Sequence, residues 1–280
     1  MNIAIIGLGL MGGSLGAALK RGDRVDRVLG YARRGETRDA ALAQGIVDEA
    51  FESPTACVRE ADLVVLCLPV LAMEPCLVEC RGALKGGALV TDVGSTKRDL
   101  HDALTIALDG ADALYIGSHP MAGSEESGLQ AADPELYRDS AVIITPEQGA
   151  DDARVIQLWE FWVSLGAIVQ ATSPAEHDRI VAATSHFPHL LASVLVRHVL
   201  SREHDVEPYC GSGFRDSTRI AEGPSDVWHD VFNSNRENLL AELKAFEEQL
   251  ASVREILESE DFEVLRVFLE HSRELREKVG

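Results

Sequence analysis

The first 170 residues alternate short apolar runs with longer mixed segments. The runs are rich in Ile, Val, Leu and Ala, which is typical of strands buried on both faces of a parallel sheet. Alternating strands and helices predict a doubly wound α/β fold with one parallel sheet. Helices are expected up to Lys20 and near 37–44, 97–108 and 153–164. Strands are expected at Asn2–Ile6, Val25–Tyr31, Asp62–Leu68, Ala88–Asp92, Leu114–Gly117, Ala141–Thr145 and Ala167–Gln170.

The pattern changes at Thr172, after which no strand pattern remains. Ser173-Pro174-Ala175-Glu176 is a capping box, so Ser173 should bond a free N–H of the first turn and Glu176 should reach back to the cap. Further helices are expected at about 174–201, 216–222 and 225–251, with one or two between 252 and 278. We therefore predict an α/β domain at 1–172 and an all-helical domain at 173–280.

A glycine-rich turn, Gly7-Leu8-Gly9-Leu10-Met11-Gly12, follows the first strand and opens a helix. This spacing is typical of dinucleotide binding. The first glycine permits the tight turn, the second lets backbone approach a pyrophosphate, and the third allows close helix–strand packing. The free N–H groups of the helix N-terminus attract the phosphates. We expect these six residues to contact the cofactor, together with Leu68 and Pro69. The alternative is a turn that binds no ligand.

The end of the second strand indicates which dinucleotide binds. An NAD site usually carries an acid about 20 residues past the glycines, bonded to the ribose 2′-OH. Here Gly30-Tyr31-Ala32-Arg33-Arg34 has no acid before Glu36. Because guanidinium groups bind phosphate in a bidentate way, Arg33 and Arg34 predict NADP as the preferred cofactor, with NAD as the second choice. The alternative is that both arginines begin a solvated helix.

Two further segments follow predicted strands, where ligands of such sheets collect. His119, in GSHPMAG, is a candidate base, because a histidine titrates near neutrality and can accept the proton of an alcohol oxidised by hydride loss. Ser95, in DVGSTK, is placed to bond the reacting hydroxyl or the nicotinamide. The alternatives are a loop histidine without function and a serine that caps the following helix.

The charge balance limits the partners. With 26 basic and 46 acidic residues the net charge is −20, which repels nucleic acid and anionic membranes. No apolar run reaches the ~20 residues that span a bilayer. The five cysteines form no C-x-x-C pair and no metal-ligand spacing with histidine. We expect reduced thiols, a cytoplasmic protein, a small-molecule substrate, and no metal, nucleic-acid or membrane partner.

Five stretches together resemble the prephenate/arogenate dehydrogenase family, and the resemblance runs from end to end of the chain. They are GLGLMGGSL, TDVGSTK, GSHPMAGSEESG, AEHDRIVAATSHFPH and GSGFRDSTRIAEGPSDVW. The resemblance implies oxidative decarboxylation of prephenate or arogenate, with hydride transfer to a nicotinamide cofactor, in tyrosine biosynthesis. It also implies that His119 is the catalytic histidine and that Ser95 orients the hydroxyl and the cofactor.

The resemblance further implies a substrate pocket. Arg219 would grip a carboxylate, and Ser185 and His189, four residues apart on one helix, share a face. Family members pair through the helical domain, so a homodimer is expected, with Arg215 and Trp228 reaching the pocket from the second subunit. The expected substrate-binding residues are Ser124, Glu125, His177, Ser185, His189, Arg215, Arg219 and Trp228.

Some alternatives stay open. Family members that use NAD tend to carry Asp where Ala32 stands, which supports NADP. The residues do not distinguish prephenate from arogenate. A β-hydroxyacid dehydrogenase-like oxidoreductase would need a lysine on the interdomain helix, and Thr172–Ser201 contains none. A non-catalytic nucleotide-binding sensor would keep the glycine turn but would need neither His119 nor Arg219.

Overall fold

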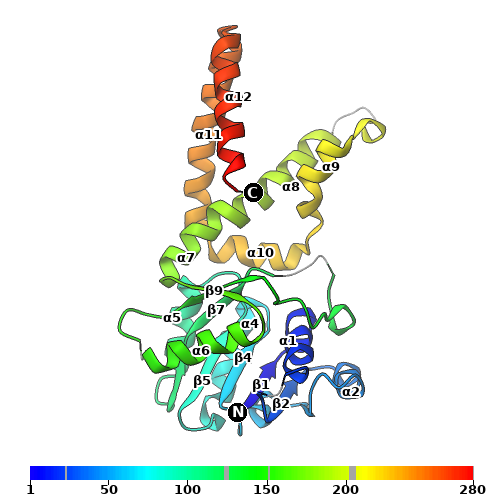
Figure 1. The fold of residues 1–280 in the computed structure, drawn as a ribbon, viewed down its shortest axis with the longest axis vertical. Helices are drawn as coiled ribbons and strands as arrows, with labels where there is room; N and C mark the ends of the chain where they lie inside the picture. The colour runs from blue at the N-terminus through cyan, green and yellow to red at the C-terminus, as the bar shows by residue number, and fades with distance from the viewer. Residues whose placement is uncertain (23, 123–125, 151, 202–205, 280) are drawn as a thin grey trace.

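The computed structural model describes residues 1–22, 24–122, 126–150, 152–201 and 206–279. Its larger sheet is parallel, with strand order β3-β2-β1-β4-β5-β6. This sheet gives the doubly wound α/β fold that the sequence predicts, and it forms the lower part of the molecule in Figure 1. The strands are β1 (Asn2–Ile6), β2 (Arg27–Tyr31), β3 (Glu49–Phe51), β4 (Leu63–Leu66), β5 (Ala88–Asp92) and β6 (Ala113–Tyr115).

Helices cover both faces of this sheet, which explains why its strands are almost continuously apolar. Successive side chains of a strand point to opposite faces. Ile3 and Ile5 therefore belong to one hydrophobic cluster, and Ala4 and Ile6 belong to another. The first cluster includes residues of α1 (Leu10–Lys20), α2 (Gly35–Ala43) and α6 (Asp152–Ser164). The second includes residues of α3 (Pro54–Cys57), α4 (Val70–Cys80) and α5 (Arg98–Ala107).

The last three strands form a separate sheet, so the prediction of a single parallel sheet is wrong here. β7 (Gly117–Pro120) runs antiparallel to β8 (Ala141–Thr145), and β8 is parallel to β9 (Ile168–Ala171). The strand predicted at 114–117 is divided at Ile116, between β6 and β7. β7 reads Gly-Ser-His-Pro and all four residues are buried, so no alternation of apolar and polar residues marks the change of sheet there.

Among the α-helices and strands of the α/β domain, β3, α3 and α4 lie where no element was predicted. β3 and α3 are only three and four residues long. α4 contains Pro75 in its interior, and proline normally interrupts a helix because it cannot donate the backbone hydrogen bond. α4 still forms, since it buries Met73, Leu77 and Cys80 against the sheet.

The rest of the described chain is helical, as predicted. α7 (Pro174–Val181), a π-helical segment (Ala182–His186) and α8 (Phe187–Leu200) form one continuous stretch. α9 (Ser212–Thr218), a 3₁₀ turn (Arg219–Glu222), α10 (Ser225–Ser234), α11 (Arg236–Glu258) and α12 (Phe262–Glu277) follow. The helix predicted at 225–251 is interrupted at Asn235, which lies between α10 and α11.

The predicted capping box at the start of α7 is half correct. The hydroxyl oxygen of Ser173 accepts a hydrogen bond from the backbone N–H of Glu176, at 3.2 Å. The Glu176 carboxylate does not return to the cap; it binds the guanidinium of Arg179 at 2.6 and 2.8 Å. A bidentate guanidinium–carboxylate pair is the stronger competitor for that side chain.

By length and composition alone, Pro174–Leu200 qualifies as a candidate membrane span: it has 27 residues, and an 18-residue window within it has a mean hydropathy of 1.2. The same stretch carries Asp178 and four histidines. It lies between the two domains, in contact with α5 and α11. Its apolar character therefore has an explanation in the packing of the protein itself.

Candidate active site

The turn between β1 and α1 is so closely packed that it requires two of its glycines. A Cβ atom on Gly7, whose φ is +110°, would lie 2.3 Å from the carbonyl oxygen of Cys67. A Cβ atom on Gly12 would lie 1.9 Å from the carbonyl oxygen of Gly7. A Cβ atom on Gly9 would meet nothing within 4 Å, so the N-terminus of α1 faces open space.

That open space has the properties of a dinucleotide site. β1 is paired with β2 on one side and β4 on the other, which is the switch point where nucleotides bind in doubly wound sheets. Within the described residues, no acid and no side-chain cap occupies the first turn of α1, so its N–H groups are left for an anion. Leu68 lies beside Gly7, and Pro69 is the N-cap residue of α4. The residues present fit a bound dinucleotide.

Arg33 and Arg34 lie at the outer end of this site, between β2 and α2, and both are exposed. Arg38 holds the turn that carries them, since its Nη1 donates to the carbonyl oxygens of Ala32 at 2.9 Å and Arg33 at 3.1 Å. The two guanidinium groups thus start from a fixed backbone beside the expected ribose position.

His119 lies within β7, opposite Ile143 of β8, and not in a loop after a strand as predicted. It is only 7% exposed. Its Nδ1 lies 2.8 Å from Nε2 of His177, and Nδ1 of His177 lies 2.7 Å from Oδ1 of Asp178. Because His177 and Asp178 belong to α7, a chain of three hydrogen-bonded side chains connects the helical domain to His119.

The environment keeps both histidines neutral near pH 7. Burial lowers the pKa of His119 well below its ordinary value, and the neighbouring His177, Lys97 and His186 lower it further. Burial also lowers the pKa of His177, although its hydrogen bond to Asp178 acts in the opposite direction. Burial alone would raise the pKa of Asp178, but hydrogen bonds from His177 and from two backbone N–H groups outweigh it and lower that pKa.

A buried ion pair shapes the loop that carries Ser95. Lys97 and Asp92 are both fully buried, with 2.5 Å between Nζ and Oδ2. Nζ of Lys97 also donates to the carbonyl oxygens of Gly94 and Thr96, at 2.7 and 3.2 Å. The loop therefore folds around the Lys97 ammonium, and Ser95, partly buried, is held at its tip.

The same Asp92 carboxylate fixes the strand of His119. Its Oδ1 accepts hydrogen bonds from the Tyr115 hydroxyl at 2.8 Å and from the backbone N–H of Ser118 at 3.2 Å. The Ser118 hydroxyl in turn accepts from the indole N–H of Trp162 at 3.0 Å. One buried carboxylate thus positions both the loop of Ser95 and the residue before His119.

The N-terminus of α5 is capped from the other domain. Oδ1 and Oδ2 of Asp178 accept the backbone N–H groups of Lys97 at 2.7 Å and Arg98 at 2.9 Å. The alternative in which Ser95 caps this helix is therefore not what the structure shows. The Ser234 hydroxyl, at the end of α10, adds a further interdomain hydrogen bond to the Thr96 hydroxyl at 3.0 Å.

A second group of buried side chains lies behind the histidine chain. The Asn235 amide donates to the backbone carbonyl of Asp178 at 2.8 Å and lies 3.1 Å from Nδ1 of His186. Burial lowers the pKa of His186 to about 4. The break between α10 and α11 at Asn235 directs this amide toward α7 and the π-helical segment, within the helical domain.

Aromatic rings form the next part of the site. His189 and Trp228 stack with 3.6 Å between ring centroids and 14° between ring planes. A Cβ on Gly223 would lie 2.5 Å from the indole nitrogen of Trp228, so this glycine permits the stack. Burial lowers the pKa of His189. Ser185, one turn before His189, is partly buried in the π-helical segment.

The remaining predicted residues lie at the surface or outside the description. Arg215 is in α9 and Arg219 begins the 3₁₀ turn that leads to Gly223, and both arginines are exposed. Ser124 and Glu125 lie outside the residues that the structure describes.

Sequence reasoning missed the side chains that hold the site together. They are Asp92, Lys97, Asp178, His186 and Asn235. One signal was available: Asp178 adjoins His177, and a carboxylate beside a histidine often orients its ring. The partners of Asp92 and Asn235 are distant in sequence, so no local pattern indicates them.

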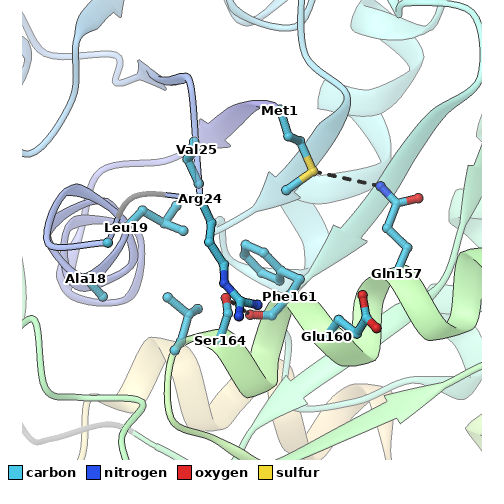
Figure 2. Close-up of a pocket in the computed structure, with 11 residues that line it drawn as sticks. Met1, Ala18, Leu19, Arg24, Val25, Gln157, Glu160, Phe161 and Ser164 are labelled. Carbon is cyan, nitrogen blue, oxygen red and sulfur yellow. Dashed lines mark hydrogen bonds between the residues drawn. The ribbon is translucent and has the colours of Figure 1, made fainter.

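A cavity of about 260 Å³ lies elsewhere, between the end of α1, the start of β1 and α6 (Figure 2). Met1, Arg24, Val25, Glu160 and Phe161 are among the residues that line it. Met1 and Val25 precede β1 and β2, so this cavity is at the amino ends of the strands. Nucleotide sites of doubly wound sheets form at the carboxyl ends, and we assign the cavity no part in the site.

Both domains match known family models. Residues 15–171 match the model described as prephenate dehydrogenase, nucleotide-binding domain, and residues 173–271 match prephenate dehydrogenase, dimerization domain. Prephenate dehydrogenase of Bacillus subtilis is 33% identical, over 99% of this chain and 75% of that protein. Cyclohexadienyl dehydrogenase of Zymomonas mobilis is 34% identical, over 98% of this chain and 93% of that protein.

Solved structures agree with these matches. Prephenate dehydrogenase from Aquifex aeolicus, in complex with hydroxyphenyl propionate and NAD⁺, has a TM-score of 0.93 and 32% identity, covering 100% of this chain and 98% of that chain. Synechocystis arogenate dehydrogenase has a TM-score of 0.88 and 27% identity, covering all of both chains. A 3-hydroxyisobutyrate dehydrogenase from Mycobacterium tuberculosis, at 15% identity and a TM-score of 0.59, shares the fold alone.

Proposed function

Because the chain belongs to the prephenate dehydrogenase family, we propose that it oxidatively decarboxylates prephenate or arogenate on the route to tyrosine. The observation that carries this proposal is a buried histidine, His119, held by a hydrogen bond to His177, in a chain that also has a glycine turn suited to a dinucleotide. A bound nicotinamide supplies the hydride acceptor. Loss of CO₂ then follows from aromatisation, so the protein needs to orient the substrate and accept a proton.

The chain's own residues divide this work. His119, neutral and with Nδ1 bound to His177, presents Nε2 as the acceptor for the ring hydroxyl proton. Ser95, at the tip of the loop built on Lys97, orients that hydroxyl. Arg219 binds a substrate carboxylate and must offset the repulsion of a protein with a net charge of −20. The substrate pocket is completed by Ser185, His189, Arg215 and Trp228. Ser124 and Glu125, at the entrance of the pocket, stay predictions from the sequence.

The test is an assay of cofactor reduction with prephenate and with arogenate as separate substrates. Turnover of either supports the proposal, and the ratio of the two kcat/KM values assigns the substrate. Arg219→Ala should raise KM with a small change in kcat, because its contact is made in the ground state and the transition state alike. Absence of turnover with both substrates would remove the proposal.

We propose NADP as the preferred cofactor, on the basis of Arg33 and Arg34 and the missing acid after β2. The double variant Arg33→Ala/Arg34→Ala should lose about tenfold or more in kcat/KM for NADP, since two charge-assisted contacts to a phosphate are removed, and should change little with NAD. Arg24→Ala, an exposed arginine at the amino ends of the strands, is the matched control (Figure 2). A wild-type protein that uses NAD more efficiently than NADP would refute this preference.

We propose that the α/β domain ends at residue 172 and the helical domain begins at residue 173. We propose that the helical domain forms a homodimer. α11 and α12 extend from the body of the molecule as a pair (Figure 1) and expose apolar side chains. These include Leu250, Leu257 and Phe262. Large exposed apolar surfaces mark interfaces. Light scattering after size exclusion should give twice the mass of 30.4 kDa. Leu250→Glu/Leu257→Glu should give the monomer, and Leu42→Glu, exposed on α2, should not.

A further inference from the structure

We propose that His177 and Asp178 are positioning residues that set the tautomer of His119 across the domain interface, so that its base exists only when the domains are docked. This inference rests on the proposed role of His119. It rests on the geometry of three buried side chains, His119, His177 and Asp178. It also rests on the two hydrogen bonds that Asp178 accepts from the backbone at the start of α5.

The direction of the hydrogen bonds follows from the carboxylate. Asp178 can only accept, so Nδ1 of His177, at 2.7 Å, must carry a proton. A neutral His177 then has an unprotonated Nε2, which accepts from Nδ1 of His119 at 2.8 Å. His119 in turn must have an unprotonated Nε2. That atom is the one free to accept a proton from a substrate.

Among the described residues, no other group takes the place of His119 or Asp178 at the two ring nitrogens of His177. Both ring nitrogens of His177 are engaged and its side chain is fully buried, so it has no nitrogen left for a ligand. The charged and titratable groups that face the chain are Lys97 and Asp92 from the β5–α5 segment and His186 from the π-helical segment. Lys97 is already paired with Asp92, so Asp178 is the carboxylate that acts on His177.

Asp178 also joins the two domains. The same carboxylate that orients His177 accepts the backbone N–H groups of Lys97 and Arg98 at the start of α5. If α7 moves away from α5, the carboxylate loses these donors and His177 loses its contact with His119. The tautomer of His119 that leaves Nε2 unprotonated is therefore set only while the two domains are docked.

When His119 accepts a proton at Nε2, it becomes an imidazolium that still donates from Nδ1 to His177. Asp178 stabilises this cation through the intervening ring, as a buried carboxylate does for a histidine base in other enzymes. No second proton has to be transferred along the chain of side chains in this step. The negative charge of Asp178 should therefore raise the pKa that governs the acid side of the kcat–pH profile.

Two variants test this. His177→Gln keeps the Asp178 bonds to α5 but cuts the link between Asp178 and His119. Asp178→Asn removes the charge. Each should lower kcat by about 10²-fold or more, with little change in KM. Each should also move the acid limb of the kcat–pH profile down by about one pH unit. Asp178→Asn removes the charge, and His177→Gln removes the ring through which the carboxylate stabilises the His119 cation.

Glu237→Gln is the matched control. It breaks the exposed interdomain ion pair with Arg98, at 3.1 Å, and leaves the histidine chain intact. Its kcat and its acid limb should stay as in the wild-type protein. If Asp178→Asn unfolds the protein, His177→Gln decides, since it retains the cap of α5.

The results separate this inference from the proposed function. Loss of activity in His119→Asn with a normal pH profile in His177→Gln overturns the positioning chain and leaves His119 as the base. Normal activity in His119→Asn overturns the proposed role of His119 itself. A drop in kcat for His177→Gln without movement of the acid limb also overturns the positioning chain, because it indicates only a structural contribution.

Discussion

Acidification from pH 7 to pH 5 should destabilise this protein because histidines are buried in neutral form at its domain interface. The clearest case is His186, which is 1% exposed and whose pKa burial lowers to about 4, from an ordinary value of 6.5. In the unfolded chain this histidine binds a proton as the pH falls below about 6.5, whereas in the folded protein it does so only near pH 4. Since the unfolded state binds more protons between these values, stability rises with pH and is lost on acidification.

The magnitude follows from the two pKa values. At pH 5 the unfolded state gains about 2 kcal/mol from protonation of His186 relative to the folded state, against a few tenths at pH 7. His119, His177 and His189 act in the same direction, because burial lowers each of their pKa values. We therefore expect a loss of at least about 2 kcal/mol in the free energy of unfolding between pH 7 and pH 5.

The assay is urea denaturation at pH 7, 6 and 5, at one fixed protein concentration so that subunit association does not contribute. His186→Gln should be less stable than the wild-type protein at pH 7, and its stability should fall by about 2 kcal/mol less between pH 7 and pH 5. His271→Gln, an exposed histidine on α12, should keep the wild-type dependence. A free energy of unfolding that is constant from pH 7 to pH 5 would refute the reasoning.

Three further substitutions have defined outcomes. His119→Asn should lower kcat by about 10³-fold with little change in KM, measured by steady-state cofactor reduction. Gly12→Ala puts a Cβ 1.9 Å from the carbonyl oxygen of Gly7, so fluorescence titration should show dinucleotide affinity reduced at least about tenfold. Lys97→Met leaves the buried carboxylate of Asp92 unpaired and should cost about 3–5 kcal/mol in urea denaturation, unless Asp92 is replaced as well.

The sequence predicts the parts of this structure that depend on local patterns. Apolar runs and the glycine turn were sufficient for β1, α1 and the doubly wound sheet, since strand burial and the αβ alternation leave a periodic signal. The division of the chain at Ile116 was not predictable, because β6 and β7, three and four residues long, are too short to show a periodic pattern. His119 was found from its motif, but its place inside β7 was not, since pairing with β8 is a long-range choice.

The support for the site was hidden for the same reason. Asp178 contacts backbone 80 and 81 residues earlier in the chain. Asn235 reaches back 57 residues to α7 and 49 residues to the π-helical segment. Such contacts form only when distant parts of the chain pack together, so local sequence patterns cannot reveal them. The residue types in the sequence predicted the chemistry of the site. The order in which the side chains are hydrogen-bonded to one another became visible only in the fold.

The π-helical segment at Ala182–His186 changes the direction in which the side chains after it project from the helix that carries the site. In a regular α-helix, His177 and His189, twelve positions apart, would point about 120° away from each other. One extra residue in the winding reduces this angle to about 20°. The irregular turn thus acts as a register correction: shortening it by one residue would rotate the stacked ring of His189 away from the side on which His177 meets β7, although every side chain would still be present.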